Sequence, residues 1–392
     1  MWRKIKIIMD NQLSNNLKNK YVENVKQANK QTESTAQQNK IKPSKTKQYK
    51  CKSCGGNLVY CPNNQDLICE KCLSHEAIQF SKNVKKHLLN EELSSKNSPS
   101  LQNENKSIKC PNCGSEIELN AYEISKICEY CGSSVISQAT NIAIKKPDGI
   151  IPFMFDKEVA SEKFVAGVKK QWLAPKQFKK KPPQSIIEGD YIPSFGFNAD
   201  AVYTYRGVLY ENFTVRDSEG HNKTERRYFN ISGADSNRYE NILVEASSKI
   251  KQDNINNILP FKYKDCFAYN DAFIAGYVVE KYDTEVENCL QKYNKLLDEN
   301  ITADILSKYR YDGVRSLNFN KTVSNETFSY YVVPVYKFSY TYKDKQYITY
   351  MNGQTGRIDS NIPKSRLKQT LLVLLPFIFV LLFIILGFFA GK

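Results

Sequence analysis

The sequence predicts an α+β fold in which an antiparallel-sheet domain follows two small four-cysteine modules and precedes one apolar helix. Three observations lead to this prediction. Eight of the 11 cysteines stand in Cys-x-x-Cys pairs, the 25 Tyr and 20 Phe residues favour half-buried sheets, and residues 371–390 form an uninterrupted apolar run. With 392 residues, the chain is long enough for two or three folded units.

The paired cysteines form two quartets with the same spacing. They are Cys51, Cys54, Cys69 and Cys72, followed by Cys110, Cys113, Cys128 and Cys131. In each quartet 14 residues separate the two pairs, enough for one strand that runs out and another that returns. A turn of two residues can direct both sulfurs of a pair at one ion. The spacing therefore predicts two zinc ribbons, each holding one structural zinc ion through four thiolates, with no open position for catalysis.

Four other side chains are interpreted as bystanders of these sites. Cys61 and His75 lie within or just after the first quartet, but four cysteines already complete a zinc shell. Cys266 and Cys289 are expected to be small buried side chains. A redox pair is the alternative for a single Cys-x-x-Cys motif, whereas two equally spaced quartets favour metal binding.

The cysteine usage and the opening residues predict a reducing compartment. MWRKIKIIMD lacks the uninterrupted apolar run of an export signal, and a chain of this length with paired cysteines is more typical of metal binding than of a disulfide framework. We therefore expect the bulk of the chain in the cytosol.

The chain divides into six predicted regions. They are a disordered basic arm (1–48), zinc ribbon 1 (49–82), a linker (83–107), zinc ribbon 2 (108–140), the α+β domain (141–365) and a transmembrane helix (369–390). The linker is polar and low in complexity, so we expect it to tether the ribbons without stacking them.

The formal net charge of +15 comes mainly from stretches outside the near-neutral ribbons and sheet. Lys and Arg outnumber Asp and Glu by 11 to 3 in residues 1–48, by 10 to 4 in residues 141–185 and by 4 to 0 in residues 364–392. Residues 108–140, which hold the second quartet, carry 2 basic against 4 acidic side chains. Nucleic-acid binding by the ribbons themselves is therefore not favoured.

The first of two amphipathic helices in the α+β domain is expected between Asp156 and Leu173. Its buried face repeats every four residues, at Ala160, Phe164, Val168 and Trp172. Acidic residues stand early and basic residues late in this segment, which suits the helix dipole.

The second helix is expected after Asp283, where Thr284 and Glu287 match a capping box. Its apolar positions are Val286, Leu290, Tyr293 and Leu297.

Alternating apolar and polar residues predict long hairpins. The segments are Tyr191 to Tyr210, Phe213 to Ile231 broken by DSEG, and Phe328 to Met351 broken by KDK. The first helix lies between Ile151-Pro152-Phe153 and YIPSFGF, and the second between Leu259-Pro260-Phe261 and VVPVYKF. This echo indicates either two related helix-plus-hairpin halves or a chance recurrence of Pro beside aromatic residues.

Residues 371–390 contain no charged or polar side chain and predict a membrane-spanning helix. At about 1.5 Å per residue they would span about 30 Å, the thickness of a bilayer core. Lys364, Arg366 and Lys368 precede the span, and only Gly391 and Lys392 follow it. The charge rule then predicts a single-pass, tail-anchored protein whose N-terminal bulk is cytoplasmic, with these three basic residues facing anionic lipid.

Signatures of catalysis are missing from the sequence. It contains no G-x-x-x-x-G-K-[ST] loop, no H-E-x-x-H and no G-x-S-x-G motif, and it has only three His residues. The segment MNGQTGR, residues 351–357, has the wrong glycine spacing for a phosphate loop and is better interpreted as turn residues. We therefore expect no enzyme activity, and an enzyme that uses a cleft of the α+β domain stays open as a third class of function.

The order of motifs resembles one bacterial family. The two ribbons are followed by IIPFMFDKEVA, YIPSFGFNAD, AFIAGYVVEKYD and VVPVYKFSYTYKDKQYITYMNGQTGR. Over residues 49–363 this resembles the TFIIB-type zinc-ribbon-containing proteins that are loosely labelled replication-restart-helicase-like. The resemblance implies zinc-binding ribbons without a helicase activity, because the ATP-binding motor is absent. Members of the family often have Trp where this chain has Phe195 and Tyr336, and many lack a membrane span.

The favoured function is that of a non-enzymatic binding or adaptor module, held at the cytosolic face of a membrane and engaging a protein partner. The alternative is a nucleic-acid-binding zinc-ribbon protein linked to replication or transcription. In that case the basic arm and a Lys-rich segment would contact DNA or RNA. The segment comprises Lys176, Lys179, Lys180 and Lys181.

Overall fold

The computed structural model describes residues 46–94, 106–120, 123–137, 145–182, 186–216, 218–359, 362–366, 368–370, 373–374 and 377. These residues belong to one compact unit, Lys45–Lys392. Almost all of the predicted basic arm and of the predicted membrane helix lies outside the described residues. No helix within the described ranges is long and apolar enough to cross a membrane.

The described elements form a mixed, sheet-rich α+β fold. The α-helices are α2 (Leu89–Ser94), α3 (Lys157–Lys170), α4 (Gln252–Ile258) and α5 (Val286–Ser307). The strands before α3 are β1 (Thr46–Lys47), β2 (Leu58–Cys61), β3 (Asp66–Cys69), β4 (His75–Glu76), β5 (His87–Leu88), β6 (Lys106–Lys109), β7 (Glu116–Leu119), β8 (Glu123–Ile127), β9 (Ser134–Ser137) and β10 (Gly149–Ile150). The later strands are β11 (Ile187–Arg216), β12 (Asn222–Glu245), β13 (Phe267–Ala268), β14 (Val278–Glu280), β15 (Gly313–Tyr342) and β16 (Lys345–Asn352).

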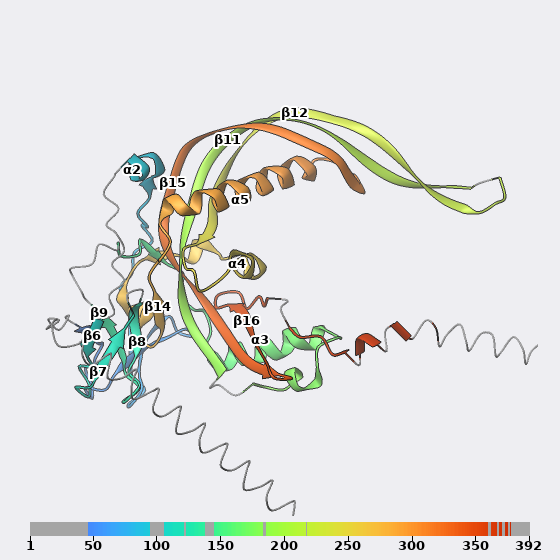
Figure 1. Ribbon diagram of the computed structural model, residues 1–392. Coiled ribbons are helices and arrows are strands. Elements are labelled where there is room, and N and C mark those ends of the chain that lie inside the picture. Colours follow the sequence, from blue (N-terminus) through green and yellow to red (C-terminus); the bar gives the residue numbers. More distant parts are fainter. Residues whose placement is uncertain are drawn as a thin grey trace, which may run out of the picture. The chain divides into compact units, whose positions relative to one another are not determined.

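Two long antiparallel strands, β11 and β15, form the centre of the large sheet, and their curved ribbons run side by side in Figure 1. On its other edge β11 pairs with β12, and β15 pairs with β16. The sheet order is β1-β9-β8-β14-β11-β15-β10-β13, with β12, β16 and β5 beside this path. The predicted hairpins at DSEG and KDK are confirmed, and both residues of the second turn, Lys343 and Asp344, have positive φ angles.

The two central strands, β11 and β15, have equivalent neighbours in the sheet, which confirms two related halves. Ile192 lies opposite Val333 at the centre of their pairing. Just before this point each strand has a short parallel neighbour, β14 for β11 and β10 for β15. Just after it each strand begins its hairpin, at Ser194 with β12 and at Val335 with β16. The halves are therefore β10-α3-β11-β12 and β14-α5-β15-β16. The short first strand of each half pairs with the central strand of the other half.

The helices follow the same relation between the halves. Phe164 of α3 stacks on Phe338 of β15 with ring centroids 4.4 Å apart, and Tyr293 of α5 stacks on Phe197 of β11 at 4.5 Å. In the sequence, YIPSFGF and VVPVYKF are indeed counterparts. Ile151-Pro152-Phe153 and Leu259-Pro260-Phe261 are not, because β14 and not the segment at 259–261 takes the place equivalent to β10.

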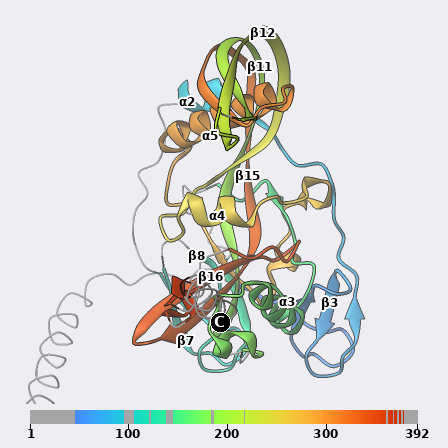
Figure 2. The same cartoon turned by 90° about the vertical axis from the view of Figure 1, so that its right-hand side faces the viewer.

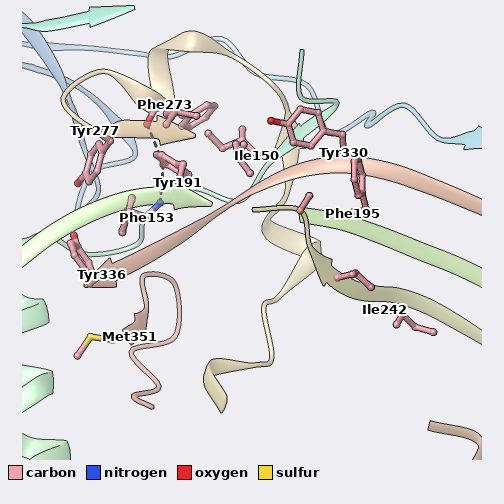
Figure 3. Close-up of a cluster of buried hydrophobic side chains, with 14 of the residues drawn as sticks. Ile150, Phe153, Tyr191, Phe195, Ile242, Phe273, Tyr277, Tyr330, Tyr336 and Met351 are labelled. Atoms are coloured by element: carbon pink, nitrogen blue, oxygen red, sulfur yellow. Dashed lines mark hydrogen bonds between the residues drawn. The ribbon is translucent and has the colours of Figure 1, made fainter. Parts of the chain in front are cut away.

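Aromatic side chains fill the core between the halves. The Tyr191 hydroxyl donates to the carbonyl of Phe273 at 3.2 Å and accepts from the amide of Phe153 at 3.3 Å, as the dashed lines in Figure 3 show. Phe153 stacks on Tyr277 at 4.5 Å, and the Tyr336 hydroxyl donates to the carbonyl of Phe155. This core connects β10, β14 and the two central strands.

Both predicted helices form, with different ends. Asp156 caps α3 by accepting the amide of Val159 at 2.9 Å, but the helix stops at Lys170. Trp172 therefore lies beyond the helix and is 52% exposed, contrary to its predicted place on the buried face. Pro175 follows closely, and a proline and its preceding residue cannot continue a helix without strain.

The start of α5 also differs from the prediction. Glu285 is the cap residue without a side-chain cap bond, while the Thr284 hydroxyl donates to Asp283 instead. Leu290 is only partly buried. The buried stripe comprises Val286, Cys289, Tyr293, Leu297, Ile301 and Ile305.

Part of the predicted linker is ordered against the sheet. β5 pairs with β15, so that His87 lies opposite Phe328, and the Ser329 hydroxyl donates to the carbonyl of Lys85 at 2.7 Å. His87 Nε2 also lies 2.9 Å from a carboxylate oxygen of Asp148. Residues 95–105 of the linker lie outside the described ranges. These contacts could not be predicted from the polar composition of the segment, because they depend on partners that are distant in the sequence.

Candidate metal centres

The first quartet sits at the ends of a hairpin, as its spacing predicts. β2 and β3 pair antiparallel, with Leu58 opposite Cys69, and β4 adds a third strand. In ribbon 2, β7 pairs with β6, and β8 pairs with β9 and β14. The second spacer therefore forms two strands as expected, but the strands with which they pair, β6, β9 and β14, lie outside the spacer.

All four Cys-x-x-Cys turns share one backbone geometry. In each, the amide of the first cysteine donates to the carbonyl five residues later, at 2.8 to 2.9 Å. The residue four positions after the first cysteine has a positive φ angle: 69° at Gly55, 60° at Leu73, 77° at Gly114 and 74° at Gly132. Glycine adopts this conformation without strain, whereas leucine does so at a cost of about 1–2 kcal/mol. Leu73 is thus the strained exception.

The sulfur atoms of each quartet are gathered around one point. In the first quartet Cys51 and Cys72 lie 3.6 Å apart and Cys54 and Cys69 lie 3.5 Å apart. The corresponding distances in the second quartet are 3.7 and 3.8 Å. A tetrahedral ion with Zn–S bonds of about 2.3 Å separates its sulfurs by about 3.8 Å. All ligand atoms of each quartet lie within 4.8 Å of one another, so both quartets have metal-binding geometry.

Serine hydroxyls form an outer shell that the sequence analysis missed. The Ser74 hydroxyl lies 3.1 Å from the sulfurs of both Cys51 and Cys72, and Ser133 lies 3.0 Å from the sulfur of Cys131. The bond to Ser74 is the main reason why the pKa of Cys51 falls to about 6. The bond to Ser133 likewise lowers the pKa of Cys131 to about 6. A serine two residues after the last cysteine of each quartet was the signal in the sequence.

The predicted bystanders stay outside the metal centres. His75 Nδ1 lies 2.9 Å from an Asp66 carboxylate oxygen, and Cys61 belongs to neither quartet. Cys266 and Cys289 are buried, at 6% and 0% exposure. Among the residues that the structure describes, the two quartets are the only groups of three or more His, Cys, Asp or Glu side chains whose ligand atoms all lie within 4.8 Å of one another.

Ribbon 1 is bound to the α+β domain by its β2 strand. The amide of Tyr60 donates to the carbonyl of Ala275 at 2.8 Å, and its hydroxyl donates to the carbonyl of Phe153 at 3.0 Å. The Tyr60 ring packs edge-on against Phe273. In Figure 2, β3 of this ribbon lies near α3, and the side chains of Asn63 and Asp156 bond at 2.9 Å.

Ribbon 2 is part of the large sheet. Ser125 of β8 lies opposite Val279 of β14, and its hydroxyl donates to the carbonyl of Tyr277 at 2.7 Å. The second quartet, whose Cys128 directly follows β8, is thereby joined through β14 to the central strand β11. Ribbon 2 is therefore not separate from the α+β domain, as the sequence predicted, but extends its large sheet through β8 and β9.

The ribbons also contact each other instead of being only tethered. The Lys50 ammonium donates to the Asn112 side chain at 3.1 Å, and the Asn57 side chain donates to Ser133 at 3.2 Å. The segment before ribbon 1 contributes β1, which pairs with β9 of ribbon 2. The outer-shell residue Ser133 is therefore also a contact between the two ribbons.

The predicted membrane-flanking residues lie near α3. The Lys368 ammonium donates to the carbonyls of Trp172 and Ala174, each at 2.7 Å, while Lys364 and Arg366 are exposed. The MNGQTGR segment is a turn, in which the Gly356 amide donates to the Asn352 carbonyl at 2.8 Å.

The comparisons with known proteins give one distant relative. No family model matches the chain, and no solved structure matches it. The chain is 28% identical over 223 residues, 57% of its length, to the Bacillus subtilis (strain 168) protein named Uncharacterized protein YdjG, of which this match covers 65%. The chain is thus similar over somewhat less than two thirds of that relative's length to a protein whose name states no activity.

Proposed function

We propose that this protein is a non-enzymatic adaptor, anchored in a membrane by residues 371–390, which presents two zinc ribbons to a protein partner at the cytosolic face. The observation that carries this proposal is the way in which the ribbons are held. Both quartets have four-thiolate geometry, which leaves no open position for a substrate. Ribbon 2 belongs to the large sheet, and ribbon 1 is hydrogen-bonded to the α+β domain through Tyr60. Such an arrangement suits rigid presentation of a surface.

The ribbon surface supports a protein partner. Leu73 is 67% exposed and Tyr130 is 71% exposed, and each stands in the second Cys-x-x-Cys turn of its ribbon. Leu73 keeps an apolar side chain in water at a strained φ of 60°. Packing among the described residues does not account for the exposure of Leu73, and strained residues are concentrated at functional sites.

The charge around ribbon 2 indicates the chemistry of the partner. Residues 108–140 carry 2 basic and 4 acidic side chains, and a zinc ion with four thiolates adds two further negative charges. A partner with an apolar pocket for Tyr130 and a basic rim complements this surface, whereas a nucleic-acid backbone is repelled by it.

The adaptor proposal predicts position-specific crosslinks. With a photoreactive amino acid at position 73 or 130 of the full-length chain in native membranes, we expect one discrete protein adduct, the same from both positions. Phe213, which is 43% exposed near the end of β11, is the matched control and is expected to give no adduct. The proposal fails if positions 73 and 130 give no adduct, or if nuclease treatment removes the adduct.

The outer shell predicts a graded effect on metal affinity. Replacing Ser74 or Ser133 with Ala removes a hydroxyl from the thiolates, and loss of such partners typically costs 10–100-fold in metal affinity. We expect a chelator to remove zinc faster from the affected ribbon alone. A colorimetric zinc indicator measures the rate of this loss. Ser115, whose hydroxyl is 3.3 Å from Cys113, provides a comparison with a longer contact. Unchanged rates in both Ser74→Ala and Ser133→Ala would show that the hydroxyls do not tune the sites.

A further inference from the structure

The segment that leads into the proposed membrane anchor is attached to the loop after α3. The amide of Ser365 donates to the carbonyl of Leu173 at 2.8 Å. Three residues later the Lys368 ammonium donates to the carbonyls of Trp172 and Ala174. In the sequence, the apolar run begins at residue 371, three residues after Lys368. The loop is therefore held where the chain would enter the bilayer.

This loop carries cations without acidic partners. Lys176, Lys179 and Lys180 lie in or just after the short helix η1 (Lys176–Lys179), and within the described ranges none of them forms an ion pair with a carboxylate. Lys181 differs, because its ammonium lies 2.9 Å from a carboxylate oxygen of Glu158. Lys176 follows Ala174, whose carbonyl accepts from Lys368, by two residues, so the lysines lie in the loop that holds the segment leading into the anchor.

Trp172 supplies an apolar group at the same place. Its side chain is 52% exposed, although its backbone carbonyl is held by Lys368. An indole ring in water loses the burial that usually stabilises it, but the ring is well suited to the boundary between lipid headgroups and acyl chains. The loop thus combines an interfacial aromatic residue with unpaired cations, next to an apolar span.

We propose that Trp172, Lys176, Lys179 and Lys180 form a second membrane contact that binds anionic phospholipid headgroups beside the anchor. This inference rests on the proposed membrane anchor. Cations attract an anionic leaflet when they lie within a Debye length, about 8–10 Å, of its surface. The same lysines could neutralise nucleic-acid phosphates, but the attachment of residues 172–174 of their loop to the segment leading into residue 371 favours lipid.

The test uses the full-length chain with Trp172 as its own reporter. The chain has only two Trp residues, so Trp2→Phe leaves Trp172 as the single tryptophan. This protein is reconstituted into vesicles of phosphatidylcholine alone or mixed with phosphatidylglycerol. Flotation reports anchoring, and quenching of tryptophan fluorescence by brominated acyl chains reports insertion of the indole.

We expect flotation in both lipids, with a blue shift and stronger quenching of Trp172 where phosphatidylglycerol is present. Replacing Lys176, Lys179 and Lys180 with Gln should return the quenching to its level in phosphatidylcholine without affecting flotation. Lys181→Gln is the matched control and should leave the quenching unchanged, because Glu158 already neutralises that cation.

The outcomes separate the inference from the anchor. A protein that does not float overturns both the anchor and this second contact. A protein that floats but whose quenching is independent of phosphatidylglycerol or of the three lysines overturns only the second contact. If duplex DNA added to phosphatidylcholine vesicles binds in a salt-dependent way that the three substitutions abolish, while phosphatidylglycerol has no effect, the lysines serve nucleic acid instead.

Discussion

Replacing Cys128 with Ser is expected to remove one zinc ion per chain and to unfold ribbon 2. The Cys128 side chain is 1% exposed, and metal binding contributes on the order of 10 kcal/mol to the folding of comparable ribbons. This exceeds what the small apolar cluster of ribbon 2 can supply. The measurement is zinc content by mass spectrometry, with limited proteolysis of residues 106–137.

The matching substitution in ribbon 1, Cys69→Ser, separates the two modules. Cys69 is 0% exposed and ends β3, but β3 belongs to a separate three-stranded sheet. Loss of ribbon 2 also removes β8 from the edge of β14, so we expect Cys128→Ser to lower the main thermal transition more than Cys69→Ser does. Cys61→Ser, outside both quartets, is the control and should retain both ions. Retention of two zinc ions by Cys128→Ser would contradict the assigned ligands.

Replacing Phe197 or Phe338 with Ala is expected to destabilise the α+β domain by about 3–5 kcal/mol in each case. The two side chains are 0% exposed and occupy equivalent positions, one stacked on Tyr293 and the other on Phe164. Each substitution leaves a cavity between a helix and the central strands. Urea unfolding of the zinc-loaded protein measures the free energy of unfolding.

Two comparisons test the internal symmetry behind this expectation. Phe213→Ala, at an exposed position near the end of β11, should change the free energy of unfolding by no more than about 0.5 kcal/mol. A double-mutant cycle of Phe164→Ala with Phe338→Ala should show a coupling of about 0.5–1.5 kcal/mol, as expected for a stacked pair. A large cost at Phe197 with a small cost at Phe338 would mean that the halves do not share one packing scheme.

The features predicted well from the sequence are those encoded over short distances. The Cys-x-x-Cys turns, the turns at DSEG and KDK, and the start of α3 next to Asp156 each depend on a few neighbouring residues. The burial of Cys266 and Cys289 follows from residue type alone. These predictions needed no knowledge of distant partners.

The features that were missed depend on contacts between distant parts of the chain. Ser125 and Val279 meet in one sheet although more than 150 residues separate them, and no local pattern announces this pairing. The segment around His87 was interpreted as a linker because its composition is polar, yet β15 and Asp148 order it. Trp172 kept the four-residue period of α3 but fell beyond its end, where Pro175 could have served as the warning.

The internal repeat shows how far a weak signal could be used. YIPSFGF and VVPVYKF, whose likeness was noted in the sequence, lie in the two central strands, where Ile192 is opposite Val333. The likeness alone did not predict that the two segments pair with each other. The equivalence of β10 with β14 could not be found in this way, since β10 is followed by Pro152 and Phe153 and β14 by Lys281 and Tyr282. Backbone pairing is retained between the halves while the side chains differ.

The measurement that tests this account most directly is the metal content of the purified full-length protein. The two quartets have matching geometry and each offers four sulfurs within 4.8 Å of one another. We predict two zinc ions per chain, both removed by a strong chelator with loss of the folded ribbons. A protein that is folded and contains no zinc, or that keeps its ribbons after the metal is removed, would contradict the account.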